Sequence, residues 1–187
     1  NEEELPKTLE ELADPKWQGK LGWAPSNASF QAHISALRKL WGEEKTEAWL
    51  KAMIQDKPTA YPKNATQVSA VGSGEIAIGG VNHYYLHTLK KQNPDLPVKN
   101  YSFPSSHDAG NILIVCGAGI TQHAANRFEA EQLLNYLISA SVQERFVNEV
   151  FEYPARKGIA SHPDVASLDS IPFVDIDQGA LADVEPT

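Results

Sequence analysis

The feature that most constrains the fold is an alternation of short, glycine-bearing strands with amphipathic helices along the first half of the chain. Residues 19–24 are predicted to form a strand, and apolar residues spaced four, three and four apart then predict a helix over 28–41. Another strand is predicted over 74–81, and it leads without a gap into a further helix. Strands that alternate with helices favour a largely parallel α/β sheet.

The rest of the chain is more varied in pattern. Further helices are predicted over residues 43–54, 65–71, 124–138 and 141–150. The apolar run 111–116 is predicted to be a strand that buries the single cysteine, Cys116. From Tyr153 onward, proline and aspartate predict an irregular strap with one short helix at most.

Net charge narrows the range of partners. The chain carries 24 acidic and 16 basic residues, a formal net charge of −8, which would repel a phosphate backbone and excludes nucleic acid as the expected partner. No apolar run is long enough to span a bilayer. The first four residues lack the basic and apolar regions of an export signal, so we expect any such signal to have been removed.

Three asparagines stand where an extended segment gives way to a helix: Asn27, Asn64 and Asn82. In a parallel α/β sheet such junctions gather at the carboxyl ends of the strands, where ligands usually bind. Free N–H groups and the helix dipole at these positions would favour an anion. Asparagine is also a good helix cap, and capping alone explains each residue taken singly.

Two adjacent tyrosines, Tyr84 and Tyr85, follow the second predicted strand. One interpretation is structural, with one ring in the core and the other facing solvent. The other is that both phenols ionise to bind a hard trivalent cation such as Fe(III), for which phenolate oxygen is a matched donor. The residue pattern alone leaves both interpretations open.

The sequence offers little for catalysis. His83 and His87 stand four apart, as in a zinc helix, but Tyr84 occupies the position where the general-base glutamate would be. No nucleophile elbow or phosphate-binding loop is present in the sequence. We therefore expect a binding protein and not an enzyme.

Four segments resemble the ferric-ion periplasmic binding proteins of bacterial iron ABC transporters. The similarity runs from about Leu5 to Val174, and the tyrosines after Val-Asn are its most specific mark. The segments are LADPKWQGKLG at 12–22, GEIAIG at 74–79, VNHYYL at 81–86 and FEYP at 151–154.

The resemblance implies the type 2 periplasmic binding protein fold, in which two α/β lobes are joined by crossing strands. Each lobe has three layers, a mostly parallel sheet with helices on both faces. Residues 1–114 would form the tyrosine-bearing C-terminal lobe, 115–160 a crossover segment that belongs to the other lobe, and 161–187 a return strap. No counterpart of the family's N-terminal lobe precedes Asn1, so the resemblance implies a fragment, with self-association through the crossover segment as one consequence.

The resemblance also implies a ligand set and a location. Fe(III) would be held by Tyr84 and Tyr85, and a synergistic anion by Asn27, Ala28, Ser29, Asn64 and Asn82. Some relatives place a third tyrosine in the loop that corresponds to 26–29, where this chain has none, and its absence favours phosphate or carbonate. The protein would lie in the bacterial periplasm, or otherwise outside the cytoplasm, and deliver iron to a membrane permease. The alternative is the same architecture carrying a small anion or organic ligand instead of iron.

Overall fold

The computed structural model describes residues 2–105 and 107–182. The chain divides into two compact units: the first combines residues 1–114 with those from 168 onward, and the second comprises 115–167. Assignment of the second unit to another lobe, and of 161–187 to a strap, stays a prediction. Among the described residues, no helix is both long and apolar enough to cross a bilayer.

The first unit is built on a small parallel sheet with the order β2-β1-β3. The strands are β1 (Leu21–Trp23), β2 (Thr59–Ala60) and β3 (Ile78–Gly79). Gly22 of β1 pairs with β2 on one side and with β3 on the other, both in parallel. The predicted strand over 74–81 is therefore paired over two residues only, because its first part follows the end of a helix and forms turn contacts instead.

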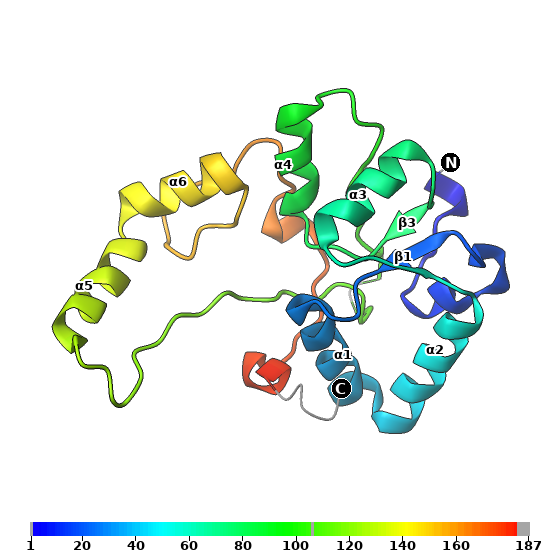
Figure 1. Cartoon of the computed structure of the whole chain (residues 1–187), viewed down its shortest axis with the longest axis horizontal. Helices are drawn as coiled ribbons and strands as arrows, with labels where there is room; N and C mark the ends of the chain where they lie inside the picture. The colour runs from blue at the N-terminus through cyan, green and yellow to red at the C-terminus, as the bar shows by residue number, and fades with distance from the viewer. Residues whose placement is uncertain (1, 106, 183–187) are drawn as a thin grey trace. The chain divides into compact units, whose positions relative to one another are not determined.

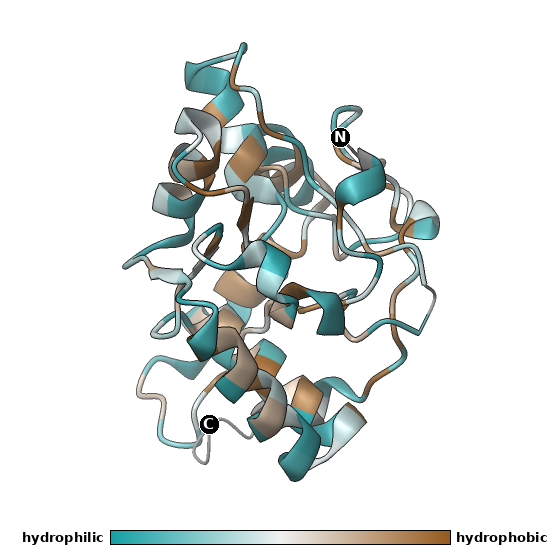
Figure 2. Cartoon of the chain, turned by 90° about the vertical axis from the view of Figure 1, so that its right-hand side faces the viewer, coloured by the Kyte–Doolittle hydropathy of each residue, from teal (hydrophilic) through white to brown (hydrophobic). Residues whose placement is uncertain are grey.

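Helices cover both faces of this sheet, as predicted. In Figure 1, α1 and α2 lie on one side of the strands and α3 and α4 on the other. These helices are α1 (Ala28–Trp41), α2 (Glu43–Gln55), α3 (Asn64–Ser73) and α4 (Tyr84–Gln92). Figure 2 shows helices that carry both hydrophobic and hydrophilic residues, as amphipathic helices require. The predicted parallel α/β architecture is confirmed.

The core lies between α1, α2 and the N-terminal turns. Leu37 and Ile34 of α1 are almost fully buried and pack with Leu9, while Met53 of α2 packs with Leu21 of β1. Each such apolar side chain stabilises the fold by about 1.5–3 kcal/mol relative to exposure. Three short 3₁₀ helices precede the sheet: Glu2–Glu4, Glu10–Ala13 and Pro15–Trp17.

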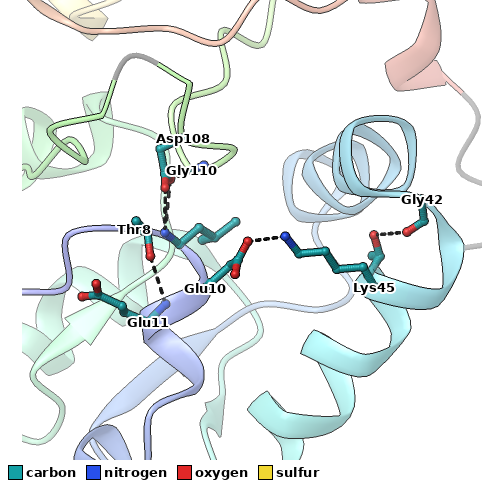
Figure 3. A network of polar contacts seen from close by, with 9 residues as sticks. Thr8, Glu10, Glu11, Gly42, Lys45, Asp108 and Gly110 are labelled. Atoms are coloured by element: carbon teal, nitrogen blue, oxygen red, sulfur yellow. Dashed lines mark hydrogen bonds and ion pairs between the residues drawn. The ribbon is translucent and has the colours of Figure 1, made fainter.

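Polar contacts hold these N-terminal turns in place (Figure 3). The buried carboxylate of Asp108 accepts hydrogen bonds from the backbone N–H groups of Leu9 (3.1 Å) and Gly110 (2.8 Å). Lys45 of α2 forms an exposed ion pair with Glu10. Residues far apart in the sequence are thereby joined, and Leu9 and Ala109 pack against Ile34 and Leu37 of α1, the helix that carries the first predicted anion contacts.

The second unit contains two helices, α5 (Arg127–Leu137) and α6 (Ala140–Val150). The buried Gln143 side chain joins their ends, because its Nε2 donates to the Leu137 carbonyl (2.8 Å) and its Oε1 accepts from Ala155 N–H (2.7 Å). Phe151 ends α6 in the left-handed region (φ 62°) and is itself buried.

Two predictions from the sequence are wrong. Residues 111–116 form no strand, because they are paired with no other strand in the described part of the chain, and Cys116 is exposed. The Leu113 carbonyl accepts instead from the Gln178 side chain (2.9 Å). The C-terminal segment contains two short 3₁₀ helices where one at most was predicted, Leu168–Ser170 and Gln178–Ala182.

Candidate anion and metal site

The site is built where three parallel strands end. Because β1, β2 and β3 are parallel, their carboxyl ends lie at one edge of the sheet, and each is followed by a helix. The N-terminal turns of α1, α3 and α4 are thus brought to that edge. Asn27, Asn64 and Asn82 are carried there with them, which is the convergence expected from the sequence.

The capping roles of the three asparagines differ from expectation. Asn27 caps α1, since its Oδ1 accepts from the Ser29 N–H at 2.9 Å. Asn64 is instead the first residue of α3, after Lys63, and Asn82 stands before His83 at the start of α4. Their side chains do not cap because they are engaged in hydrogen bonds to other side chains.

Those hydrogen bonds join the junctions directly. The Ser29 hydroxyl lies 2.5 Å from Asn27 Oδ1 and 2.8 Å from Asn82 Oδ1. The Asn64 Nδ2 group donates to the same Asn82 oxygen at 3.0 Å. Three residues that are far apart in the sequence therefore meet at Asn82 Oδ1. Ala28, the first residue of α1, supplies one of the N–H groups that a helix leaves unpaired at its start.

Sequence reasoning missed a further member, Gln67. It lies one turn after Asn64 on α3 and is fully buried. Its Nε2 donates to Asn64 Oδ1 (3.2 Å) and to the Gly80 carbonyl (3.1 Å). The spacing Asn-x-x-Gln at the start of a helix is the signal that could have revealed it, because residues three apart share a face. Asn27, Ser29, Asn64, Gln67 and Asn82 are called the amide cluster below.

The amide cluster is polar but contains no ionisable side chain. Its suitability for an anion comes from N–H and O–H donors and from the positive ends of the α1, α3 and α4 dipoles. Asn64 is 3% exposed and Gln67 is 0% exposed, whereas Asn82 is only partly buried. The cluster is therefore fixed from the interior by Asn64 and Gln67, whereas Asn27, Ser29 and Asn82 are partly exposed to solvent.

Tyr84 and Tyr85 form the first turn of α4. Their ring centroids lie 4.5 Å apart, with the planes inclined at 36°, and both residues are partly buried. The next residue, Leu86, is 3% exposed and anchors the helix. The backbone joins the pair to the amide cluster, because the Tyr85 N–H donates to the Asn82 carbonyl (3.3 Å).

Tyr61 shows a tyrosine in a different environment. Its hydroxyl donates to Glu75 at 2.7 Å. Loss of hydration, together with the hydrogen bond to Glu75 and its negative charge, raises the pKa of Tyr61 to about 12. A phenol in this position resists ionisation and is a poor metal ligand.

The described residues contain no group of three His, Cys, Asp or Glu side chains that could hold a metal ion. The paired phenols are the metal ligands that the sequence predicts. Phenolate is a hard oxygen donor that suits Fe(III), and the α4 N-terminus favours negative charge at this position.

The chain is similar to proteins whose names refer to iron binding or iron uptake. The chain is 34% identical over 181 residues to the Fe(3+)-binding periplasmic protein of Serratia marcescens, covering 95% of this chain and 53% of that protein. It is 34% identical over 173 residues to iron uptake protein A1 of Synechocystis, covering 89% of this chain and 48% of that protein. The chain thus spans about half the length of these curated relatives.

A solved structure extends the similarity to the fold. Iron-bound HitA from Pseudomonas aeruginosa superposes with a TM-score of 0.92 at 29% identity, over 100% of this chain and 60% of that one. The type 2 periplasmic binding protein fold predicted from the sequence is confirmed. The family model described as bacterial extracellular solute-binding protein matches residues 1–178. Members of this family lie outside the cytoplasm, which agrees with the predicted location. The chain belongs to the bacterial extracellular solute-binding protein family.

Proposed function

We propose that this chain is the anion-binding and tyrosine-bearing part of a ferric iron carrier that serves an ABC transporter. Fe(III) is bound by Tyr84 and Tyr85. A synergistic anion, phosphate or carbonate, is bound by Asn27, Ala28, Ser29, Asn64 and Asn82. The loaded protein delivers its iron to a membrane permease.

One observation carries this proposal: the hydrogen-bonded amide cluster lies at the start of the same helix whose first turn holds the two tyrosines. Asn82 stands two residues before Tyr84, and the Tyr85 N–H is bonded to the Asn82 carbonyl. An anion at Asn82 would therefore be close to a metal held by the phenolates. The relatives whose names state ferric binding support the choice of metal.

Charge explains why the two ligands would act together. Two phenolates neutralise two of the three charges of Fe(III), so the metal still attracts an anion. The amide cluster supplies donors without a competing cation, and the anion then bridges the helix N-termini and the metal. Several coordination positions stay open, and binding by this chain alone is expected to be weak.

A ferric titration tests the proposal. Iron is buffered by a weak chelator, with phosphate or carbonate present, and phenolate-to-iron charge transfer is followed by visible absorption. The double variant Tyr84→Phe, Tyr85→Phe should lose the colour and weaken iron binding by at least about 100-fold, the equivalent of about 2.7 kcal/mol. Tyr136→Phe, which changes an exposed tyrosine of α5, is the matched control and should bind as the parent.

The second candidate is a carrier of a small anion or organic ligand. The observation that favours it is that the hydrogen bonds joining Ser29, Asn64 and Asn82 are formed among the side chains of the amide cluster itself. Under this alternative, phosphate binds with the same affinity whether or not iron is present, and the tyrosine variants bind it normally. Colour that depends on the tyrosines and on added anion excludes this candidate.

A further inference from the structure

The residue that fixes the amide cluster is Gln67, which the ligand set proposed above does not include. It is fully buried on α3 and reaches two acceptors, the Gly80 carbonyl at 3.1 Å and Asn64 Oδ1 at 3.2 Å. Both contacts use the same Nε2 group. Gln67 therefore joins the strand side of the site to the helix side.

The Gly80 carbonyl determines how the side-chain amides of Gln67 and Asn64 are oriented. A backbone carbonyl can only accept a hydrogen bond, so the end of the Gln67 amide that faces it must be the NH₂ group. The same NH₂ group faces Asn64, which must turn its oxygen toward Gln67. Asn64 then presents its Nδ2 to Asn82 Oδ1, where the distance is 3.0 Å.

The last amide in this series is Asn82. Its oxygen is occupied by Asn64 Nδ2 and by the Ser29 hydroxyl at 2.8 Å. Its Nδ2 group is the remaining end, and no acceptor among residues 2–105 and 107–182 bonds to it. A donor without a protein partner on a partly buried side chain is suited to an anion.

We propose that Gln67 is a positioning residue of the anion site. Because its NH₂ group must face the Gly80 carbonyl, Gln67 fixes the orientation of the Asn64 amide. Asn64 in turn fixes the Asn82 amide, so that the Asn82 NH₂ group points toward the anion. This inference rests on the proposed function, because it assigns the means by which that site presents a donor. Gln67 does not touch the anion itself. The ligand it serves is an oxyanion of the phosphate or carbonate type.

Two details favour this role over simple packing. Gln67 Oε1 is buried and has no hydrogen-bond partner in the described structure, whereas both ends of the buried Gln143 amide are bonded. Gln67 is therefore oriented through its NH₂ group alone, by the oxygens of Gly80 and Asn64. In addition, a Cβ at Gly79 would lie 3.2 Å from Gln67 Cβ and 3.4 Å from Oε1, so the glycine leaves room for this side chain.

The test is a titration of the ¹⁵N-labelled 187-residue chain with inorganic phosphate, without iron. Side-chain amide resonances are followed by NMR. In the parent, phosphate should shift the Asn82 NH₂ resonances strongly and those of Gln67 little. Gln67→Leu should weaken phosphate binding about tenfold, because Asn64 and Asn82 are then free to turn over. Gln67→Glu should abolish the Asn82 shift, because the new carboxylate attracts Asn64 Nδ2 and reverses both amides.

Gln143→Leu is the matched control, since it removes another buried glutamine, which lies in the second unit. It should leave phosphate affinity within about twofold of the parent. If Gln67→Leu does not fold, Gly79→Ala provides the second variant, which presses on Gln67 and should weaken phosphate binding severalfold. Gly117→Ala, where the added methyl group meets nothing within 4 Å, is its control.

The outcomes separate the inference from the function on which it rests. Phosphate affinity and an Asn82 shift that survive both Gln67 variants overturn the positioning role alone. A parent chain that binds neither phosphate nor carbonate overturns the anion part of the proposed function and the positioning role with it. Loss of the Asn82 shift in the Gln67 variants, with the Gln143 control unchanged, supports the inference.

Discussion

The amide cluster and the tyrosine pair meet at the start of α4, yet they differ in how completely the fold orders them before a ligand binds. Asn64 and Gln67 are buried and hydrogen-bonded, and they hold Asn82 from within. Tyr84 and Tyr85 lie on the first turn of α4 and are partly buried, with their rings inclined against each other. One region is fixed by the interior of the protein, and the other is presented at its surface.

This difference suggests that the two parts of the proposed site bind their ligands under different conditions. A preorganised set of donors binds an anion without the cost of ordering side chains on binding. The phenols, in contrast, need a metal to compensate their charge once ionised. We therefore expect the anion half to function without iron, and the metal half to depend on both tyrosines and on the anion.

The largest effect is expected from Asn82→Asp. The new carboxylate keeps the size of the side chain but replaces its donor by a negative charge at the point where the anion would bind. Loss of a charge-assisted hydrogen bond and the added repulsion should cost about 2–3 kcal/mol, or roughly 30- to 150-fold in phosphate affinity. Isothermal titration with phosphate measures it.

The control for this charge change is Asn135→Asp on the exposed surface of α5. It adds the same charge to the chain, so a general electrostatic effect would weaken phosphate binding in both variants. Equal affinities in the two variants would contradict the placement of the anion at Asn82.

The next effect is on stability. Asn64→Leu should lower the free energy of unfolding by about 1–3 kcal/mol, because it leaves Gln67 Nε2 and Asn82 Oδ1 without one of their partners. All four tryptophans lie between residues 17 and 49, so tryptophan fluorescence during urea unfolding reports on the first unit. Asn135→Leu should stay within about 0.5 kcal/mol of the parent. Similar small losses in both variants would show that the amide cluster is not held as tightly as proposed.

Much of this arrangement was predictable from the sequence because it follows from topology. Parallel strands followed by helices place Asn27, Asn64 and Asn82 at one edge of the sheet. Asparagine is a residue type that is favoured where a helix begins. Gln67 was not predicted, since its role depends on the position of the Gly80 carbonyl, which only the paired strand fixes.

The wrong strand prediction has a physical cause. The helix periodicity is a local property, and the predicted helices were found close to their expected bounds. The apolar residues of the run 111–116 predict a strand, but a strand needs a partner, and hydrogen-bond partners are not local. For the same reason Cys116 was expected to be buried and is exposed.

A smaller effect is expected on the pH dependence of stability, through His33 of α1. The His33 ring bonds to the Ala109 carbonyl (2.8 Å). Burial lowers the pKa of His33 below its ordinary value of 6.5, against the opposing influence of Ala109 and Asp108. Below pH 6.5 the unfolded chain therefore binds a proton that the folded chain does not. As the pH is lowered below 6.5, the free energy of unfolding should decrease by at most about 1.4 kcal/mol per pH unit.

Urea unfolding followed by tryptophan fluorescence between pH 5 and 8 measures this dependence. His33→Gln keeps a donor for Ala109 and removes the titration, so its stability should vary less below pH 6.5. His123→Gln, which changes an exposed residue of the second unit, should leave the profile unchanged. If the His33→Gln variant showed the same pH profile as the parent, the protonation of His33 would not be the cause of the loss of stability at low pH.

The smallest effect sharpens the comparison from the side of the tyrosines. Tyr85→Phe removes a hydroxyl that forms no hydrogen bond within the described structure, so the free energy of unfolding should change by less than about 0.5 kcal/mol. Tyr61→Phe removes the hydrogen bond to Glu75 and should cost about 0.5–1 kcal/mol. Ferric binding should show the opposite order, because only Tyr85 is proposed to bind the metal. If Tyr85→Phe proved the more destabilising change and left ferric binding intact, the tyrosine pair would be part of the fold and the metal would have to be bound elsewhere.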